Sequence, residues 1–264
     1  MAHMQTDELL QLITEVAAQV ITPRFRALGA AEIDEKSPGD YVTVADREAE
    51  VLITAALLAR SPRALVVGEE AAHADPGLVR GLASAEHAYT VDPVDGTTNF
   101  VRGSPRYAVM VAELRRGEVT RSWIWQPEMQ VAYVAERGAG LYRNEVRVSR
   151  PDAPLPPRGA TTRRSWRHFE SFGQLDPVLD TNYCAGFDYS QLVDGEVDYF
   201  TYLRPKPWDH LPGSLMLDEI GGASIDAQGQ PYGPSTGAEA TIITASSPEL
   251  ARQVAGFWRP APRG

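Results

Sequence analysis

The stretch VDPVDGTTNF, residues 91–100, brings two carboxylates, Asp92 and Asp95, to the end of an apolar run. A glycine and two threonines follow directly. Neighbouring carboxylates repel each other and raise each other's pKa when no cation neutralises them. The stretch itself contains no lysine or arginine. The spacing therefore indicates a site that takes up positive charge from outside the segment.

Each of three further acids has a simple structural explanation when it is taken alone. Asp46 is spaced from Thr43 as in a capping box at the start of a helix. Glu69 follows the apolar run ALVV as a solvated strand end. Asp209 is placed as a helix N-cap, where a negative charge is favoured.

Taken together, the acids predict a metal site. Glu69, Asp92 and Asp95 each end a predicted strand, and such ends converge on one edge of a sheet. The helix that begins at Asp209 points toward the same edge. These carboxylates and the Val94 carbonyl form an all-oxygen site, because no cysteine or suitably spaced histidine accompanies them. Such a site suits Mg²⁺, with Mn²⁺ as the alternative ion.

The residues after the second aspartate predict an anion site. Gly96 allows a ligand to approach the backbone. The amides of Gly96, Thr97 and Thr98 open a short predicted helix and form an anion cradle. A cation site beside an anion cradle is the arrangement that phosphate-ester chemistry requires.

Composition narrows the class of protein. The chain has 264 residues, of which 43% are hydrophobic, and its net charge of −10 argues against binding to nucleic acid or to a membrane surface. The single cysteine, Cys184, excludes an internal disulfide and is interpreted as a small buried hydrophobic residue. No apolar run reaches transmembrane length and no signal peptide opens the chain, so a cytoplasmic location is predicted.

Hydrophobic periodicity gives the order of the elements. It predicts a helix over 7–28 with Thr6 as N-cap, a second helix over about 45–60, and a helix from about Asp209 closed by Gly221. Strands are predicted in the segments RALVVGEE, HAYTVDPVDGTTNF, YAVMVAEL, VTRSWIWQ and MQVAYVAE. Two helices followed by a mainly antiparallel sheet predict an α+β fold rather than a doubly wound parallel sheet.

A proline-rich segment, 150–164, is the predicted boundary between two lobes. The N-terminal α+β lobe, 5–150, carries most of the candidate metal ligands. The C-terminal α/β lobe, 151–264, carries Asp209 and the elements that determine substrate specificity. The two lobes are expected to form one compact unit.

The segment DPVDGTTNF resembles the signature of the inositol monophosphatase family, a group of magnesium-dependent, lithium-sensitive sugar phosphatases. Supporting segments occur in the family's order: SPGDYVTVADREAE (37–50), VVGEE (66–70), GAGLYRNEVRVS (138–149) and WDHLPGSLMLDEIGG (208–222). The resemblance implies a layered αβαβα sandwich of the sugar-phosphatase type, a homodimer, and two or three Mg²⁺ ions in each site.

The resemblance also implies roles for individual residues. Its metal ligands correspond to Glu69, Asp92, the Val94 carbonyl, Asp95 and Asp209. Asp46 would lie near a further, weaker metal position and belong to the catalytic group. Glu69 would be the base for an attacking water that also contacts Thr97. Asp209 would in addition orient a substrate hydroxyl.

The chain departs from the inositol-specific pattern in two places. Where the family commonly has Gly-Ser-Ala-Ala, this chain has NYCAGFDYS (182–190). No carboxylate occurs between Tyr199 and Trp208, where inositol-type members usually carry one, and Arg204 and Lys206 stand there instead. A solvated loop explains each cation singly. If either faces the pocket, it should recognise a second anionic group of the substrate.

Three functional hypotheses follow. The first is hydrolysis of a small phosphate monoester, such as a sugar phosphate, histidinol phosphate or a biosynthetic intermediate. The second is a 3′(2′),5′-bisphosphate nucleotidase, which a base-stacking aromatic such as Trp166 or Tyr202 would favour. The third is a catalytically silent binding protein, which the retention of every expected ligand position argues against.

Overall fold

Two β-sheets organise the chain in the computed structural model. The residues that it describes are 4–166, 169 and 171–258. The larger sheet has seven strands in chain order: β3 (Leu65–Gly68), β4 (Ala88–Asp95), β5 (Ala108–Arg115), β6 (Glu118–Gln126), β7 (Val131–Glu136), β8 (Gly140–Arg143) and β9 (Val146–Arg147). The smaller sheet has five strands in the order β11 (Leu179–Asp180), β10 (Gly159–Thr161), β12 (Tyr199–Leu203), β14 (Thr241–Ala245) and β13 (Ala223–Asp226). In the larger sheet only β3 and β4 pair in parallel.

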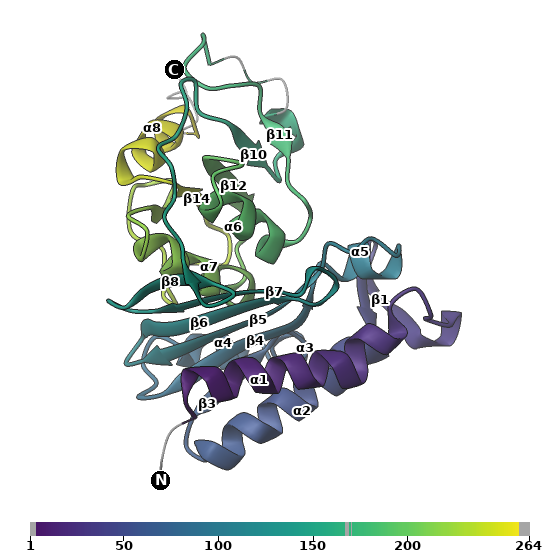
Figure 1. Ribbon diagram of the computed structural model, residues 1–264. Coiled ribbons are helices and arrows are strands. Elements are labelled where there is room, and N and C mark those ends of the chain that lie inside the picture. Colours follow the sequence, from purple (N-terminus) through teal and green to yellow (C-terminus); the bar gives the residue numbers. More distant parts are fainter. Residues whose placement is uncertain (1–3, 167–168, 170, 259–264) are drawn as a thin grey trace.

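Helices cover and separate the sheets in five layers, α, β, α, β, α (Figure 1). One outer layer contains α1 (Thr6–Val16) and α2 (Val44–Arg60), which lie along one face of the larger sheet. The middle layer contains α6 (Ala185–Val193) and α7 (Pro207–Asp218). The last layer is α8 (Pro248–Trp258), which packs on the smaller sheet. The predicted α+β sandwich is thereby confirmed.

Short elements connect these layers near the ends of β3 and β4. They are the hairpin of β1 (Ile33–Ser37) and β2 (Asp40–Thr43), and the helices α3 (Glu69–Ala74), α4 (Gly77–Gly81) and α5 (Thr97–Val101). The hairpin leads directly into α2, α3 follows β3 directly, and one residue, Gly96, separates β4 from α5. Every predicted acid therefore lies at or next to such a junction, except Asp209, which belongs to α7.

The larger sheet is buried on both faces. Alternate side chains of β4, β5 and β6, such as Tyr89, Val109 and Trp123, face α1 and α2. Their neighbours, such as Met110 and Ile124, face the middle helices. Because successive strand residues point to opposite faces, a sheet covered on both sides needs continuous apolar runs. This is why the strands could be recognised from the sequence.

The first helix differs from its prediction. The chain is α-helical from Thr6 to Val16, continues as a π-helix over Ala17–Ile21 and ends as a 3₁₀-helix over Thr22–Arg24, so the predicted end at residue 28 is wrong. Gln5, rather than Thr6, is the N-cap, and the backbone amide of Gln5 donates to the Glu8 carboxylate at 2.8 Å. Pro23 lacks an amide hydrogen, which accounts for the tightened last turn.

Two predicted acidic positions shift by one or two residues. Glu69 is the first residue of α3, immediately after β3 ends at Gly68, rather than the last residue of the strand. Helix α7 begins at Pro207, because proline suits the first helical position, so Asp209 lies in the first turn and is not the N-cap. The prediction of two lobes stays a prediction; side chains of both sheets share the core around α6 and α7.

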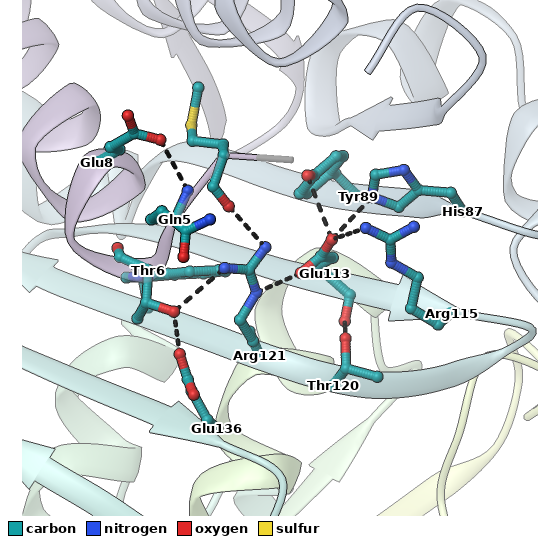
Figure 2. A network of polar contacts seen from close by, with 12 residues as sticks. Gln5, Thr6, Glu8, His87, Tyr89, Glu113, Arg115, Thr120, Arg121 and Glu136 are labelled. Atoms are coloured by element: carbon teal, nitrogen blue, oxygen red, sulfur yellow. Dashed lines mark hydrogen bonds and ion pairs between the residues drawn. The ribbon is translucent and has the colours of Figure 1, made fainter. Parts of the chain in front are cut away.

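A buried ion network joins the start of α1 to the larger sheet (Figure 2). Glu113 of β5 is 1% exposed. Its carboxylate contacts His87 Nε2 and accepts from Arg115 Nη2, both at 2.8 Å, and also accepts from Arg121. Arg121 further donates to Thr6 Oγ1 at 3.1 Å. Burial alone would raise the pKa of Glu113, but His87 and the arginines outweigh it and lower the pKa to about 2.

We predict that Glu113→Gln lowers the free energy of unfolding at pH 7 by about 2–4 kcal/mol, because Arg121 keeps its charge and loses its partner. A depressed folded-state pKa contributes stability above the usual value of 4.5, and that contribution is lost as the pH falls toward about 2. The difference between wild type and variant should therefore shrink in urea unfolding curves recorded at successively lower pH over this interval.

The matched control is Glu118→Gln, in which the replaced side chain is 62% exposed and pairs with Arg137 on the surface. It should change the free energy of unfolding by less than about 0.5 kcal/mol. Equal effects of the two substitutions, or a Glu113→Gln effect that does not vary with pH, would contradict the assignment.

Candidate active site

A cavity of about 310 Å³ opens at the ends of β3 and β4. The carboxylates of Asp92 and Asp95 reach it from β4 and that of Asp209 from α7. Of the residues predicted from the sequence, those that line it are Glu69, Asp92, Asp95, Gly96, Thr97, Thr98, Lys206 and Asp209. The fold therefore brings together the acids from segments that are far apart in the chain.

Asp92 and Asp95 are buried, Glu69 and Asp209 are partly exposed, and these carboxyl groups repel one another. Asp92 is 2% exposed and Asp95 is 7% exposed. Burial first, and then the charges of Glu69, Asp95 and Asp209, raise the pKa of Asp92 well above its usual value. Burial and the charges of Asp95 and Glu69 do the same for Asp209. Such a cluster is stabilised by any cation that enters it.

Lys36 of β1 supplies one positive charge to this cluster. Its Nζ lies 2.8 Å from Glu69 Oε1 and 2.6 Å from Glu70 Oε1, and its side chain is 6% exposed. Burial would lower the pKa of Lys36, but the two glutamates outweigh it and raise the pKa. Glu69 still has its pKa raised to about 7, because burial and the nearby Glu70 and Asp46 charges exceed the effect of Lys36.

Glu50 of α2 positions the start of α3. Its carboxylate accepts from the amides of Glu70 at 2.8 Å and Ala71 at 2.9 Å, which are among the first amides of α3. Gly68 leaves the space for this contact, since a Cβ there would overlap the Glu50 carboxylate. The direction in which Glu69 enters the cavity is thus set from α2.

Asp46 makes the predicted capping box and a second contact. Its Oδ2 accepts from the amide and the hydroxyl of Thr43, at 2.9 and 2.5 Å. Its Oδ1 lies 3.1 Å from Thr97 Oγ1, which also donates to the Val94 carbonyl at 2.9 Å. Burial outweighs the hydrogen bonds from Thr43 and raises the pKa of Asp46 to about 6. The helix cap and the candidate site therefore share one carboxylate.

Asp95 is held from the middle layer. Its carboxylate accepts from the amides of Ala185 at 3.1 Å and Gly186 at 2.6 Å, and from the Cys184 thiol at 2.9 Å. Cys184 is buried, as predicted, but it is not only an apolar filler, because its thiol contacts the carboxylate. The first amides of α6 thus fix the last residue of β4.

Gly96 makes a close approach to another segment that the sequence did not predict. It lies in the left-handed region with φ 84°, and a Cβ there would meet Cys184 Cβ at 2.9 Å and the Arg106 carbonyl at 3.1 Å. The missing side chain therefore allows Cys184, the N-cap of α6, to approach the backbone of this turn, and the approach of a ligand to Gly96 stays a prediction. Whether the amides of Gly96, Thr97 and Thr98 bind an anion stays a prediction.

The carboxyl cluster fits a hard divalent cation by its chemistry. Its donors are oxygen atoms, and its acids outnumber the one cation, Lys36, that pairs with them, which is an environment that Mg²⁺ suits. No three or more His, Cys, Asp or Glu side chains in the described part of the chain already form a ready metal group. Lys36 engages Glu69, and the α6 amides engage Asp95, in the conformation observed.

The structure separates the two cations that the sequence placed before α7. Lys206 lines this cavity and a neighbouring one of about 700 Å³. Arg204 lines neither, and its side chain is 75% exposed and pairs with Glu239. Trp166, one of the two proposed base-stacking aromatics, packs in the α8 core, and Tyr202 is 4% exposed with its hydroxyl on Asp188.

Sequence reasoning missed Lys36, Glu50 and the α6 amides. Asp46 and Glu50 are four residues apart and therefore share one face of a helix, a signal that could have been used. Lys36 and the segment at Cys184 meet the site only through tertiary structure, and no local pattern marks them.

Comparison with known proteins now identifies the family. Residues 5–259 match the sequence model of the inositol monophosphatase family. The chain belongs to the inositol monophosphatase family. An inositol-1-monophosphatase of Rhizobium meliloti is 31% identical over 81% of this chain and 82% of the relative. The Nus factor SuhB of Vibrio cholerae is 32% identical over 74% of this chain and 75% of the relative.

A solved structure supports the fold. The IMPase of Thermotoga maritima superposes with a TM-score of 0.79 at 21% identity and covers 95% of both chains. At this identity the likeness concerns the sandwich rather than the substrate.

Membership of the family supports a phosphatase. None of the helices within residues 4–166 and 171–258 is long and apolar enough to cross a bilayer.

We predict that Glu50→Gln lowers the free energy of unfolding by about 1–3 kcal/mol, because the amide offers one acceptor where two backbone donors need one each. Urea unfolding measures the change. Glu48→Gln is the matched control on the same helix, since Glu48 is 53% exposed and pairs with Arg24. An effect of Glu50→Gln no larger than that of the control would show that Glu50 does not anchor α3.

Proposed function

We propose that the chain is a Mg²⁺-dependent phosphatase that hydrolyses a small-molecule phosphate monoester by direct attack of water. The observation that carries this proposal is the set of buried, mutually repelling carboxyl groups around one cavity in a member of the inositol monophosphatase family. Carboxylates arranged in this way are of little use to folding, but they bind divalent cations and, through them, phosphate.

Glu69, Asp92, the Val94 carbonyl, Asp95 and Asp209 are the residues that would hold Mg²⁺, with Asp46 near a weaker position. When bound, the ions supply Lewis-acid charge that offsets the negative charge of the phosphate group and favours attack by water. Mn²⁺ is the alternative ion because it also prefers oxygen ligands.

The chain's own residues supply the proton transfers and the orientation. Glu69 takes the proton of the attacking water, whose oxygen forms the new bond to phosphorus. Thr97, fixed by Asp46 and the Val94 carbonyl, orients that water. The bond from phosphorus to the alcohol oxygen breaks, and the oxygen leaves with its electron pair and takes up a proton. Asp209 orients the hydroxyl beside this ester.

The nucleotidase hypothesis loses the two aromatic residues that would have favoured it, since Trp166 and Tyr202 are both packed in cores. It stays an alternative that a substrate panel distinguishes. The third hypothesis, a catalytically silent binding protein, predicts no hydrolysis with Mg²⁺. A relative named as a Nus factor is a reason to test it. The homodimer, the number of ions, the cytoplasmic location and inhibition by Li⁺ stay predictions.

We predict that Asp92→Asn and Asp95→Asn each lower kcat by about a thousandfold or more while the protein stays folded, because each removes charge that the divalent ion requires. Release of inorganic phosphate from a panel of esters, with Mg²⁺ or with EDTA, measures activity, and circular dichroism checks the fold. Asp7→Asn, an exposed substitution in α1, should retain wild-type activity. Near wild-type turnover in either variant, or in EDTA, would refute the metal assignment.

We predict that Lys206→Ala raises KM by about 5- to 10-fold for an ester that carries a second phosphate or a carboxylate, with a smaller effect on kcat, because an ammonium group near the cavity attracts that anion. Arg204→Ala is the matched control, because Arg204 is turned to solvent and should change KM less than twofold. Equal effects of both substitutions, or preference for a monoester without a second anion, would count against this role.

A further inference from the structure

The two sides of the cavity come from different parts of the sandwich. Glu69 follows β3, which pairs with one edge of β4. Helix α6 packs against β5 and β6, which lie on the other side of β4, and it holds Asp95 there. If Glu69 takes the proton of the attacking water, in-line displacement sends the alcohol away from Glu69 and toward the start of α6. The residues just before α6 therefore face the alcohol.

Tyr183 occupies this position. It lines the cavity together with Asp92, Asp95 and Asp209, directly before the residues that hold Asp95. Tyr183 is 56% exposed, so its ring is accessible to a ligand in the cavity. Its backbone lies in the left-handed region with φ 55°, a conformation that disfavours a bulky residue. The strain alone assigns no role, because Phe172 has φ 54° outside this cavity.

The polar groups next to Tyr183 are engaged within the protein. The Asp188 carboxylate is 1% exposed and accepts from the amide and the side chain of Asn182, at 2.8 and 2.7 Å, and from the Tyr202 hydroxyl at 3.1 Å. The Cys184 thiol is bonded to Asp95. In the segment before α6, the side chain that lines the cavity is thus the ring of Tyr183, whereas the carboxylate that can orient a hydroxyl next to the ester, Asp209, comes from α7.

We infer that Tyr183 is a specificity-determining residue that packs its ring against the alcohol, and that the substrates preferred by this chain are phosphate monoesters of alcohols bearing an aromatic ring. This inference rests on the proposed function, since it assumes hydrolysis at the carboxyl cluster. Aromatic pairs prefer offset or edge-to-face contact and add to the affinity gained from burial alone. A polyol has no aromatic ring and therefore gains no such contact with Tyr183.

The test compares two primary alkyl esters, 2-phenylethyl phosphate and glycerol 3-phosphate, so that the reacting bond is alike and only the alcohol differs. Tyr183→Gly should raise KM for 2-phenylethyl phosphate by about 3- to 10-fold and change KM for glycerol 3-phosphate by less than about twofold. The kcat values should change little. Tyr183→Phe, which keeps the ring, should behave as wild type. Competitive inhibition by inorganic phosphate, which contacts only the phosphate site, should be the same in all variants.

Phe172→Gly is the matched control, because it also replaces an exposed aromatic residue in the left-handed region, outside the cavity. Thermal unfolding checks that each variant folds. The inference is wrong if Tyr183→Gly shifts both esters equally, leaves the preference unchanged, or acts no differently from Phe172→Gly. If wild type with Mg²⁺ hydrolyses neither these esters nor any other in the panel, the proposed function fails and this inference fails with it.

Discussion

The repulsion among buried carboxyl groups at the end of β4 is the constraint on which the site depends. The acids are held by different elements of the fold: Asp46 by its own helix cap in α2, Glu69 by Lys36 of β1 and, through α3, by Glu50, and Asp95 by the first amides of α6. No single element could hold all of these charges close together. The cavity lies where the larger sheet meets the β1–β2 hairpin, the start of α3 and the middle helices.

Glu113 shows what burial does to a carboxylate when cations are built in. Glu113 and Asp92 are both almost fully buried on neighbouring strands of one sheet. The arginines around Glu113 bring its pKa down to about 2, whereas the acids around Asp92 raise the pKa of that residue. The fold therefore neutralises a carboxylate with its own side chains where the purpose is structural. At the cavity it leaves the charge to be offset by something that binds.

The sequence predicted those parts of the fold and site that depend on local patterns. Strands of a doubly covered sheet are continuous apolar runs, and the segment containing Asp92 and Asp95 is a compact motif, so both were recognisable. The end of the first helix was missed because π and 3₁₀ turns continue the same apolar spacing. Lys36, Glu50 and the α6 amides were missed because their partners are distant in the chain. Arg204 and Lys206 could not be distinguished from the sequence, and only the structure places Lys206, and not Arg204, at the cavity.

In the proposed function, the segment before α6 joins a residue that would hold the metal to one that would contact the substrate. Cys184, Ala185 and Gly186 fix Asp95, and Tyr183 is the residue that precedes them. Gly96 is pressed against Cys184, so this segment cannot move outward without disturbing the turn that follows Asp95. If Tyr183 contacts the alcohol as inferred, a different alcohol has to be accommodated by the side chain at position 183 rather than by a shift of the backbone. The geometry of the carboxyl groups would then stay fixed while the side chain at this position determines which alcohol fits.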